Sequence, residues 1–295
     1  MKILITGVTG FIGRNLTKCL LSYNYDLYAI VRSHSDIAHV DKRVTLFEYN
    51  SDIEKLITFF EDEKFDGVIH LASLFLATHR SCDIHPMVHS NIQFGTELLE
   101  ASKATHVKWF INTGTFWQNY HDKPYNPVNL YAATKEAFLM IAKYYTETSS
   151  LVFTTLKLCD TFGKDDTRNK VFNLWDKISK NGDTLEMSKG EQLIDISYID
   201  DVVYAYELLI EHLNSDNCQE FQNKTFAVTS NERMSLQELS KLFEEVTSKK
   251  LTIVWGARDY REREVMIPWT QGEIVPGWRQ RHTLRNAIKK TVGNI

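Results

Sequence analysis

The sequence predicts an α/β protein, in which a doubly wound parallel β-sheet is followed by a smaller C-terminal lobe. Short apolar segments rich in β-branched residues alternate with longer amphipathic segments through the first half of the 295 residues, as strands alternate with helices in parallel sheets. The short segments show little apolar–polar alternation, which indicates that both faces of the sheet are covered. The pattern stops after about Gly163, where the lobe is expected to begin.

Six strands are expected in the first half. The first is KILIT, in which three consecutive apolar residues follow Lys2, and the later ones are likewise short apolar segments with β-branched and aromatic residues. They cover residues 2–6, 26–32, 43–49, 66–72, 107–112 and 152–158.

Helices are expected between these strands, where apolar residues recur at helical spacing. They cover residues 12–22, 52–62, 87–104 and a segment from just after Pro127 to about Tyr145. Two more helices follow in the second half, at 198–213 and 234–247. The first carries Asp200 near its positive N-terminus, and the second has Ser235 and Glu238 in the pattern of a capping box.

These elements divide the chain into two parts. Residues 1–163, joined again by roughly 195–228, form the sheet domain, and residues 164–295 form most of the lobe. The tail mixes arginines with aromatic residues, as expected for a lid over the carboxyl edge of the sheet, where open α/β folds bind ligands.

Composition excludes several classes of protein. The formal net charge is −4 without a long basic block, so nucleic acid is not an expected partner. No apolar run is long enough to span a membrane, and the glycine-broken N-terminus reads as a buried strand rather than a signal peptide. The four scattered cysteines give neither a disulfide framework nor a metal site and fit a reducing cytosol, so we expect a cytoplasmic protein.

Three glycines separate the first strand from the first helix. Gly7 permits a tight turn, Gly10 lets the backbone approach a pyrophosphate at the helix N-terminus, and Gly13 lets the helix pack closely on the sheet. Because the triplet lies between a predicted strand and a predicted helix, it indicates a Rossmann-type, NAD(P)-binding domain. The alternative is a merely tight structural turn.

The end of the second strand selects between the two nicotinamide dinucleotides. An NAD site usually offers an acidic residue there, but this chain has Arg32 and Ser33 and no acid before Asp36. A guanidinium can form a bidentate pair with a 2′-phosphate. We therefore expect NADP(H), unless Arg32 lies over the adenine ring or in solvent.

Tyr131 and Lys135 lie four residues apart in a predicted helix and therefore share one of its faces. A nearby ammonium favours the phenolate and lowers the pKa of the phenol, so Tyr131 is expected to act as a general acid toward a carbonyl group, with Lys135 also holding ribose hydroxyls. A hydroxyl to hold the substrate oxygen is expected from Thr113 or Thr115, which point the same way along an extended segment.

The motifs together resemble the extended short-chain dehydrogenase/reductases, the NAD-dependent epimerase/dehydratase family. The resemblance rests on TGVTGFIG at the start, HLAS at 70–73, Asn91 with Gly95 and Thr96, TGT at 113–115, YAATK at 131–135, YIDDV at 198–202 and VPGW at 275–278. It implies that Phe11, Ile12, Leu71 and Ala72 help to hold the cofactor. It also implies a catalytic hydroxyl after the fifth strand, at Thr115 by counting forward from the strand or at Thr113 by counting back, and we favour Thr115.

Within this family the residues favour a 4-ketoreductase. The family's dehydratases carry an acidic pair after the threonine, where this chain has Gly114 and Phe116, and its 3,5-epimerases use a Cys and a His there. A 4-epimerase, with tightly bound NAD, remains the alternative, and Arg32 favours the reductase. The segments NTGTFWQ, YNPVNLYAATK and YREREVMIPW resemble the reductases that finish CDP-linked 3,6-dideoxyhexoses, the abequose and paratose synthases.

The resemblance also implies a nucleotide-sugar substrate, with a CDP-sugar favoured, and a homodimer. A diphosphate is bound by arginines, and Arg261, which precedes Glu264 as in the family's R-x-x-D/E element, is the expected contact. Asp160 is expected to accept a sugar hydroxyl, although a turn-stabilising role explains it equally well. Ile194 stands where the family often has a further arginine. A non-catalytic dinucleotide sensor on the same fold is a rival hypothesis, but such proteins commonly lose the tyrosine or the lysine.

Overall fold

The structure is a computed structural model that describes residues 1–292. Its centre is a parallel sheet of eight strands in the order β14-β11-β6-β5-β4-β1-β2-β3. The strands are β1 (Lys2–Thr6), β2 (Asp26–Val31), β3 (Thr45–Glu48), β4 (Gly67–His70), β5 (Trp109–Thr115), β6 (Val152–Leu158), β11 (Thr225–Val228) and β14 (Glu273–Ile274). The α/β prediction and the six expected strands are confirmed.

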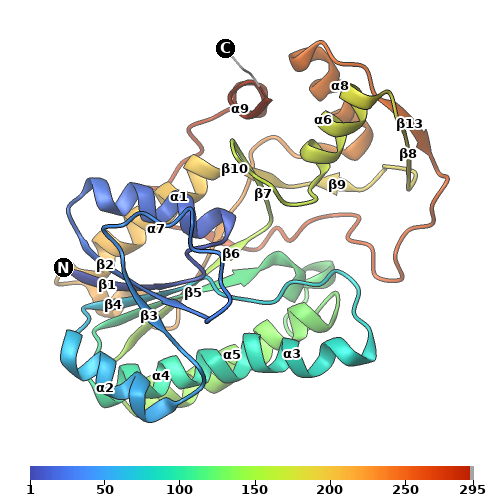
Figure 1. Cartoon of the computed structure of the whole chain (residues 1–295). Helices are drawn as coiled ribbons and strands as arrows, with labels where there is room; N and C mark the ends of the chain where they lie inside the picture. The colour runs from blue at the N-terminus through green and yellow to red at the C-terminus, as the bar shows by residue number, and fades with distance from the viewer. Residues whose placement is uncertain (293–295) are drawn as a thin grey trace.

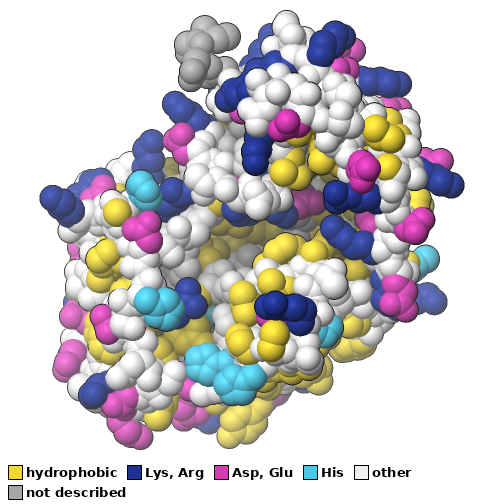
Figure 2. Space-filling view, turned by 45° about the vertical axis from the view of Figure 1, so that its right-hand side comes forward, with side chains coloured by type: hydrophobic (Ala, Val, Ile, Leu, Met, Phe, Trp, Pro, Cys, Tyr) yellow, Lys and Arg dark blue, Asp and Glu magenta, His cyan; other side chains and the backbone are white. Residues whose placement is uncertain are grey.

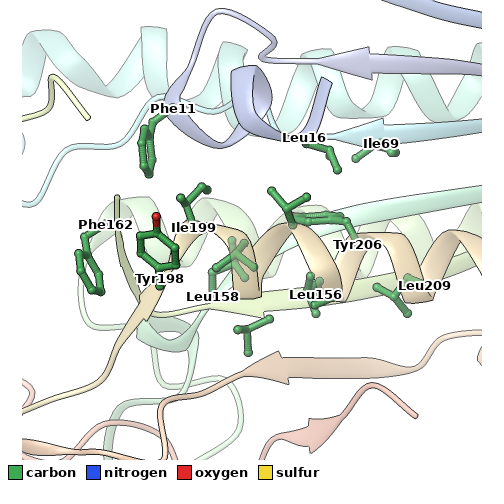
Figure 3. Close-up of a cluster of buried hydrophobic side chains, with 14 of the residues drawn as sticks. Phe11, Leu16, Ile69, Leu156, Leu158, Phe162, Tyr198, Ile199, Tyr206 and Leu209 are labelled. Atoms are coloured by element: carbon green, nitrogen blue, oxygen red, sulfur yellow. The ribbon is translucent and has the colours of Figure 1, made fainter. Parts of the chain in front are cut away.

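Helices cover both faces of the sheet (Figure 1). One face carries α1 (Phe11–Ser22) and α7 (Ile199–Leu213), and the other carries α2 (Ile53–Glu63), α4 (Phe94–Ala104) and α5 (Leu130–Glu147). Side chains of successive strand residues point to opposite faces, so Ile3 and Ile5 join one buried cluster while Leu4 joins the other. In Figure 3, Leu16 of α1 and Ile199 and Tyr206 of α7 lie in the first cluster.

The second half of the chain, apart from β6, α7, β11 and β14, mainly forms a lobe beside the carboxyl edge of the sheet (Figure 1). Its elements, with the short strands that lead to it, are β7 (Asp160–Phe162), α6 (Val171–Asn181), β8 (Thr184–Met187), β9 (Leu193–Ile194), β10 (Ile196–Tyr198), β12 (Met234–Ser235), α8 (Leu236–Thr247), β13 (Thr252–Trp255) and α9 (Leu284–Val292). The short 3-10 turn η5 (Cys218–Phe221) instead packs against α7 and β6 of the sheet domain. The capping box of α8 is confirmed, because Ser235 accepts from the Glu238 N–H at 3.1 Å and Glu238 accepts from the Ser235 N–H at 2.8 Å.

The helix expected at 87–104 is confirmed, but it starts earlier and is less regular than expected. The segment expected at 87–104 begins earlier, as η1 (Ser81–Asp83) and α3 (Ile84–Val88), passes through a π-helical turn, η2 (His89–Gln93), and continues as α4. The buried Asn91 side chain within η2 accepts from the Leu74 N–H at 2.7 Å and donates to Thr134 Oγ1 at 2.9 Å. This turn therefore ties the helix to the loop after β4 and to α5.

The two-part division predicted from the sequence stays a prediction, with one detail to add. Residues 273–274, inside the range expected for the lobe, pair with β11 in the main sheet. Within residues 1–292, no helix combines the length and the apolar character that crossing a membrane requires.

Candidate active site

A continuous cleft runs along the carboxyl edge of the sheet. It consists of three cavities: a second-strand cavity of about 410 Å³ that includes Arg32 and Ala72, a central cavity of about 470 Å³ that includes Tyr131, and a lobe cavity of about 330 Å³ that includes Arg261 and Arg263. Figure 2 shows the hollow between the body and the lobe, with apolar side chains in its floor and basic side chains at its rim.

The three cavities share walls, so an elongated ligand can pass through all of them. The second-strand and central cavities share Gly7, Gly10, Leu71 and Ser73. The central and lobe cavities share Phe75, Trp117, Cys159, Asp160, Asn169 and Lys170. The strands that supply these loops are neighbours in the sheet, which is why residues far apart in the sequence meet here.

The glycine turn has the geometry predicted for it. Gly7 has φ of +75°, and a Cβ there would lie 2.9 Å from the Ala72 nitrogen. A Cβ on Gly13 would lie 2.2 Å from the Gly7 carbonyl oxygen. Both positions therefore exclude a side chain, and Gly10 stands as the N-cap of α1.

This turn fits a dinucleotide pyrophosphate. The first backbone N–H groups of α1 are free of intrahelical partners and carry the positive end of the helix dipole. Phe11 and Ile12, at this end, line the central cavity, and Leu71 and Ala72 line the second-strand cavity. These four predicted cofactor contacts thus lie along one ligand path, and the absence of side chains at the turn leaves room for the phosphates.

Arg32 lies at the second-strand end of the cleft. It is exposed and lines the second-strand cavity together with Ser35, whose hydroxyl accepts from the Arg32 N–H at 3.0 Å. Ser33, the second donor suggested by the sequence, is not among the lining residues, and Ser35 takes its place in the wall. The region therefore offers a guanidinium and a hydroxyl, and its lining contains no carboxylate among the described residues.

Helix α5 positions Tyr131 and Lys135. Its N-cap is Asn129, whose side chain accepts from the Ala132 N–H at 3.0 Å and donates to the Ala77 carbonyl at 3.0 Å. The cap therefore fixes the start of α5 against the loop after β4. Tyr131 lines the central cavity, and Lys135 lies one turn further along the helix, with 2% of its surface exposed.

Burial dominates the ionisation of both residues. It raises the pKa of Tyr131 to about 12, with a smaller opposing effect of a hydrogen bond to Ser73. It lowers the pKa of Lys135 to about 8. The lowered phenol pKa expected from the neighbouring ammonium is not found in this structure, because desolvation of the phenolate dominates and the hydrogen bond to Ser73 opposes it only in part. A neutral phenol at physiological pH suits a proton donor.

Both candidate threonines line the central cavity. The Thr113 hydroxyl lies 2.6 Å from the Tyr206 hydroxyl, and burial raises the pKa of Tyr206. The Thr115 hydroxyl accepts from the Trp117 N–H at 3.3 Å and caps a 3-10 turn, η3 (Phe116–Gln118). The assignment of the catalytic hydroxyl to Thr115 therefore stays a prediction, with Thr113 at the same wall.

Asp160 lies on the wall shared by the central and lobe cavities and forms an ion pair with Lys170 at 2.7 Å. Lys170 immediately precedes α6 and was not singled out from the sequence. No sequence pattern marks it, because a lysine in the polar segment KDDTRNK resembles an ordinary solvated loop residue.

Arg261 and Arg263 line the lobe cavity, whereas Arg258 does not. Arg261 lies 5.9 Å from the centre of the Trp117 ring, and its N–H donates to Glu264 at 3.3 Å. Arg263 donates to Asn126 Oδ1 at 2.5 Å. Ile194 also lines this cavity, so the position where the family often has an arginine faces the cleft with an apolar side chain.

Several lining residues were missed by the sequence reasoning. Ser73 and Phe75 follow β4, and the Phe75 ring meets Tyr131 edge-on at 5.0 Å. Arg168 lines the central cavity and lies 4.5 Å from the centre of the Phe11 ring. Ser73 could have been found, because it belongs to the HLAS motif, whereas the others occupy loops without a recurring pattern.

Comparison with known proteins identifies relatives over most of the chain. Residues 3–223 match the NAD-dependent epimerase/dehydratase family. The CDP-abequose synthase of Salmonella muenchen is 27% identical over 295 residues, which cover 98% of this chain and 96% of that enzyme. The CDP-abequose synthase of Yersinia pseudotuberculosis is 28% identical over 272 residues, which cover 91% and 92%.

Solved structures share the fold. The UDP-glucose 4-epimerase of Thermotoga maritima, solved with UDP-glucose, superposes with a TM-score of 0.85 at 23% identity and covers 99% of this chain and 97% of its own. The UDP-glucuronic acid 4-epimerase of Bacillus cereus, solved with UDP-glucuronic acid and NAD, has a TM-score of 0.85 at 21% identity and covers 99% and 98%. At these identities the likeness establishes the fold alone.

Proposed function

Because the chain belongs to the NAD-dependent epimerase/dehydratase family, we propose that it reduces the 4-keto group of a nucleoside-diphosphate 6-deoxy or 3,6-dideoxy sugar with NADPH. The observation that carries this proposal is the position of Tyr131, in a central cavity that opens on one side to Arg32 and the glycine turn and on the other to Arg261 and Arg263. The similarity to CDP-abequose synthases favours a CDP-sugar that serves deoxysugar and lipopolysaccharide biosynthesis.

Each step of carbonyl reduction can be assigned to the cofactor or to a residue of the cleft. A bound nicotinamide supplies the hydride. Tyr131 Oη, a neutral phenol whose pKa burial raises to about 12, donates the proton to the carbonyl oxygen. Thr115, or Thr113 beside it, holds that oxygen by a hydrogen bond, and the charged form of Lys135 stabilises the phenolate left behind. Reduction thus adds one hydride and one proton across the carbonyl group.

Two features favour reduction over the other reactions of the family. The threonines are flanked by Gly114 and Phe116, so no carboxylate follows them to remove water from the sugar. Arg32 at the second-strand cavity favours the 2′-phosphate of NADPH, and cells use NADPH as an exchangeable reductant. We infer from these features that the cofactor leaves after each turnover.

The proposal is tested by NADPH consumption with a panel of 4-keto-6-deoxy and 4-keto-3,6-dideoxy sugar nucleotides. Stoichiometric oxidation with one of them is expected. Tyr131→Phe should lower kcat by at least about 100-fold with little change in NADPH affinity. Thr113→Val and Thr115→Val, measured alongside, identify the catalytic hydroxyl. Only the variant that removes this hydroxyl should lower kcat by a factor comparable to that of Tyr131→Phe.

A 4-epimerase is the second candidate, favoured by the 4-epimerases among the structural neighbours. It predicts that NAD copurifies with the protein and that a 4-hydroxyl inverts without net consumption of cofactor. If this is observed and no keto sugar oxidises NADPH, the epimerase replaces the reductase. Turnover of either kind would exclude the non-catalytic sensor.

We also propose that the protein is a homodimer. Helices α3 and α5 expose apolar side chains at Ile84, Val88, Met140 and Tyr144, which are between 40% and 59% exposed. Apolar side chains gathered on neighbouring helices are a common basis of association between copies of a chain. The molecular mass in solution, measured by light scattering, tests this proposal.

A further inference from the structure

The wall between the central and lobe cavities carries a single ion pair among the described residues. Of its six residues, Phe75, Trp117, Cys159, Asp160, Asn169 and Lys170, only two are charged, and they are 2.7 Å apart. The Asp160 side chain is 42% exposed and that of Lys170 is 28% exposed. The pair thus faces the cleft.

The pair can open without loosening the backbone around it. Asp160 begins β7 and Lys170 precedes α6, and other contacts hold the loop between them. Arg168 donates to the Thr161 carbonyl at 2.9 Å and pairs with the buried Asp166 at 2.8 Å. An ion pair exposed to this degree stabilises a fold by no more than about 1 kcal/mol. Neither residue is therefore needed to hold the loop.

A second contact keeps the ammonium over the cleft. Lys170 Nζ lies 5.1 Å from the centre of the Phe75 ring, a distance at which a cation is attracted by the ring face. If Asp160 released it, Lys170 would still be directed toward the wall between the two cavities.

The arrangement of cations gives Lys170 a particular place along the ligand path. Arg261 and Arg263 line the lobe cavity only, and the Arg263 guanidinium is already bonded to Asn126. Within residues 1–292, Lys170 is the one cation that lines both cavities. With the sugar at Tyr131 and the nucleotide in the lobe cavity, the sugar-linked phosphate must cross the shared wall.

We propose that the Asp160–Lys170 ion pair exchanges partners when a nucleotide sugar binds: Lys170 moves to the sugar-linked phosphate, and Asp160 becomes an acceptor for a hydroxyl of the sugar. This rests on the proposed substrate class. A phosphate oxygen is a charged acceptor that replaces the carboxylate, so the ammonium stays paired throughout.

The exchange predicts opposite effects of two single substitutions. Lys170→Met removes a phosphate contact and should weaken binding of a nucleoside diphosphate by about tenfold. Asp160→Asn frees Lys170 in advance and should strengthen the same binding severalfold, while it raises the KM of the complete sugar nucleotide. In the Lys170→Met background, Asp160→Asn should give no gain, because the two effects share one group. A purely structural ion pair would make both single variants weaker binders.

The test is calorimetric titration of CDP and of UDP into the protein at saturating NADPH, with wild type, both single variants and the double variant. Lys180→Met is the matched control, because Lys180 forms an ion pair of equal length, 2.7 Å, with Asp176 on the same α6 but lines none of the three cavities. Opposite shifts in Lys170→Met and Asp160→Asn, with an unchanged control, support the exchange.

Two results would overturn it in distinguishable ways. If wild type binds CDP or UDP and Lys170→Met binds it equally well, or if Asp160→Asn weakens it as Lys170→Met does, the exchange is wrong while the proposed function stands. If wild type binds neither nucleotide, the proposed substrate class is wrong and the exchange falls with it.

Discussion

Tyr131 and Lys135 share one helix face, and burial moves their pKa values in opposite directions. The pKa of the phenol rises to about 12 and that of the ammonium falls to about 8. The folded protein therefore holds a charged lysine at neutral pH against the cost of desolvation. This desolvation cost links the proposed catalytic role of Lys135 to the stability of the protein.

Lys135→Met should make the protein more stable and inactive. At pH 7 we expect the free energy of unfolding to rise by roughly 1–3 kcal/mol, because the buried charge is removed, and turnover to fall by at least about 100-fold. The folded pKa of Lys135 lies below its unfolded value, so wild type gains stability as the pH rises from about 8 toward about 10.5. The difference between the two proteins should disappear over that range.

Urea unfolding at several pH values measures this effect. Lys143→Met, an exposed lysine on the same helix, is the control and should change stability by less than about 0.5 kcal/mol. A Lys135→Met protein that is less stable than wild type at pH 7 would contradict the prediction.

Arg32→Asp should shift the cofactor preference from NADPH toward NADH. The guanidinium lines the second-strand cavity, and a carboxylate there would repel a 2′-phosphate while accepting from ribose hydroxyls. We expect kcat/KM for NADPH to fall by about 100-fold and that for NADH to rise. Steady-state kinetics with both cofactors measure this, and His34→Ala, an exposed neighbour outside the cavity lining, should change neither. Retained NADPH preference would show that Arg32 does not contact the phosphate.

At the scale of single residues, the sequence predicts those site residues whose position depends on a local backbone conformation or on their spacing along a helix. Gly7, Gly13 and the Tyr131–Lys135 pair depend on local geometry, and local geometry can be predicted from a motif. Lys170 and Phe75 depend on which loops meet across the cleft, so nothing in their own neighbourhood marks them. The pKa of Tyr131 could not be predicted either, because its burial follows from packing of the loop after β4.

Among the elements, the π-helical turn η2 has the most direct effect on the site. The Asn91 side chain within it is fully buried and bonds both to the backbone of Leu74 and to Thr134 of α5. π-helical turns are rare in proteins, but those that occur often lie near functional sites. Here the turn fixes the loop that supplies Ser73 and Phe75 to the central cavity.

Asn91→Ala should destabilise the protein by about 2–4 kcal/mol, because it leaves the Leu74 N–H and the Thr134 hydroxyl without this partner. Gln93→Ala is the control in the same turn. The Gln93 side chain bonds only to Glu97 at the exposed surface in the described hydrogen bonds, and its loss should cost less than about 0.5 kcal/mol. Thermal unfolding compares them, and equal losses would mean that the tie between the loop and α5 contributes little.

The first six strands of the sheet and the helices between them could be predicted because each contains its own apolar pattern, whereas β11 was not expected. The π-helical turn inside the helix expected at 87–104 could not be predicted, because helical spacing does not distinguish an α-turn from a π-turn. The short strands β9, β12 and β14 contain two residues each. They form only through pairing with distant segments, so no local sequence pattern predicts them.

On the scale of the whole molecule, a largely buried ion pair within the described residues joins segments that are far apart in the sequence. Asp195, whose side chain is fully buried, pairs with Arg233 at 2.8 Å and accepts from the Thr229 hydroxyl after β11. Arg233 also donates to the Trp269 carbonyl of the tail at 2.8 Å. Burial raises the pKa of Asp195 despite these partners, and Arg233 is one of the groups that oppose this rise. The charged form of the buried carboxylate is therefore stabilised by the arginine.

Arg233→Met should destabilise the protein by roughly 2–4 kcal/mol at pH 8, because it leaves a buried carboxylate without its cation. Protonation relieves this penalty. With the folded pKa raised above the unfolded value, the loss is complete above the folded pKa and shrinks as the pH falls through it. We therefore expect a smaller loss at about pH 5 than at pH 8.

Unfolding at both pH values measures the difference. Arg285→Met breaks an exposed pair with Glu245 of the same length, 2.8 Å, and should cost less than about 1 kcal/mol at either pH. A loss for Arg233→Met that does not depend on pH would contradict the role assigned to Asp195.

The order of the strands also determines which strand edge stays unpaired while the chain is being synthesised. β6 has β5 on one side and β11 on the other, and β11 reaches the ribosome exit only after residues 159–224 have been synthesised. At common elongation rates this takes on the order of ten seconds. During that time β6 is an open edge with unpaired backbone groups, a template on which two nascent chains can associate. Placing the lobe between neighbouring strands thus gives the cleft its second wall and exposes each new chain to aggregation during synthesis.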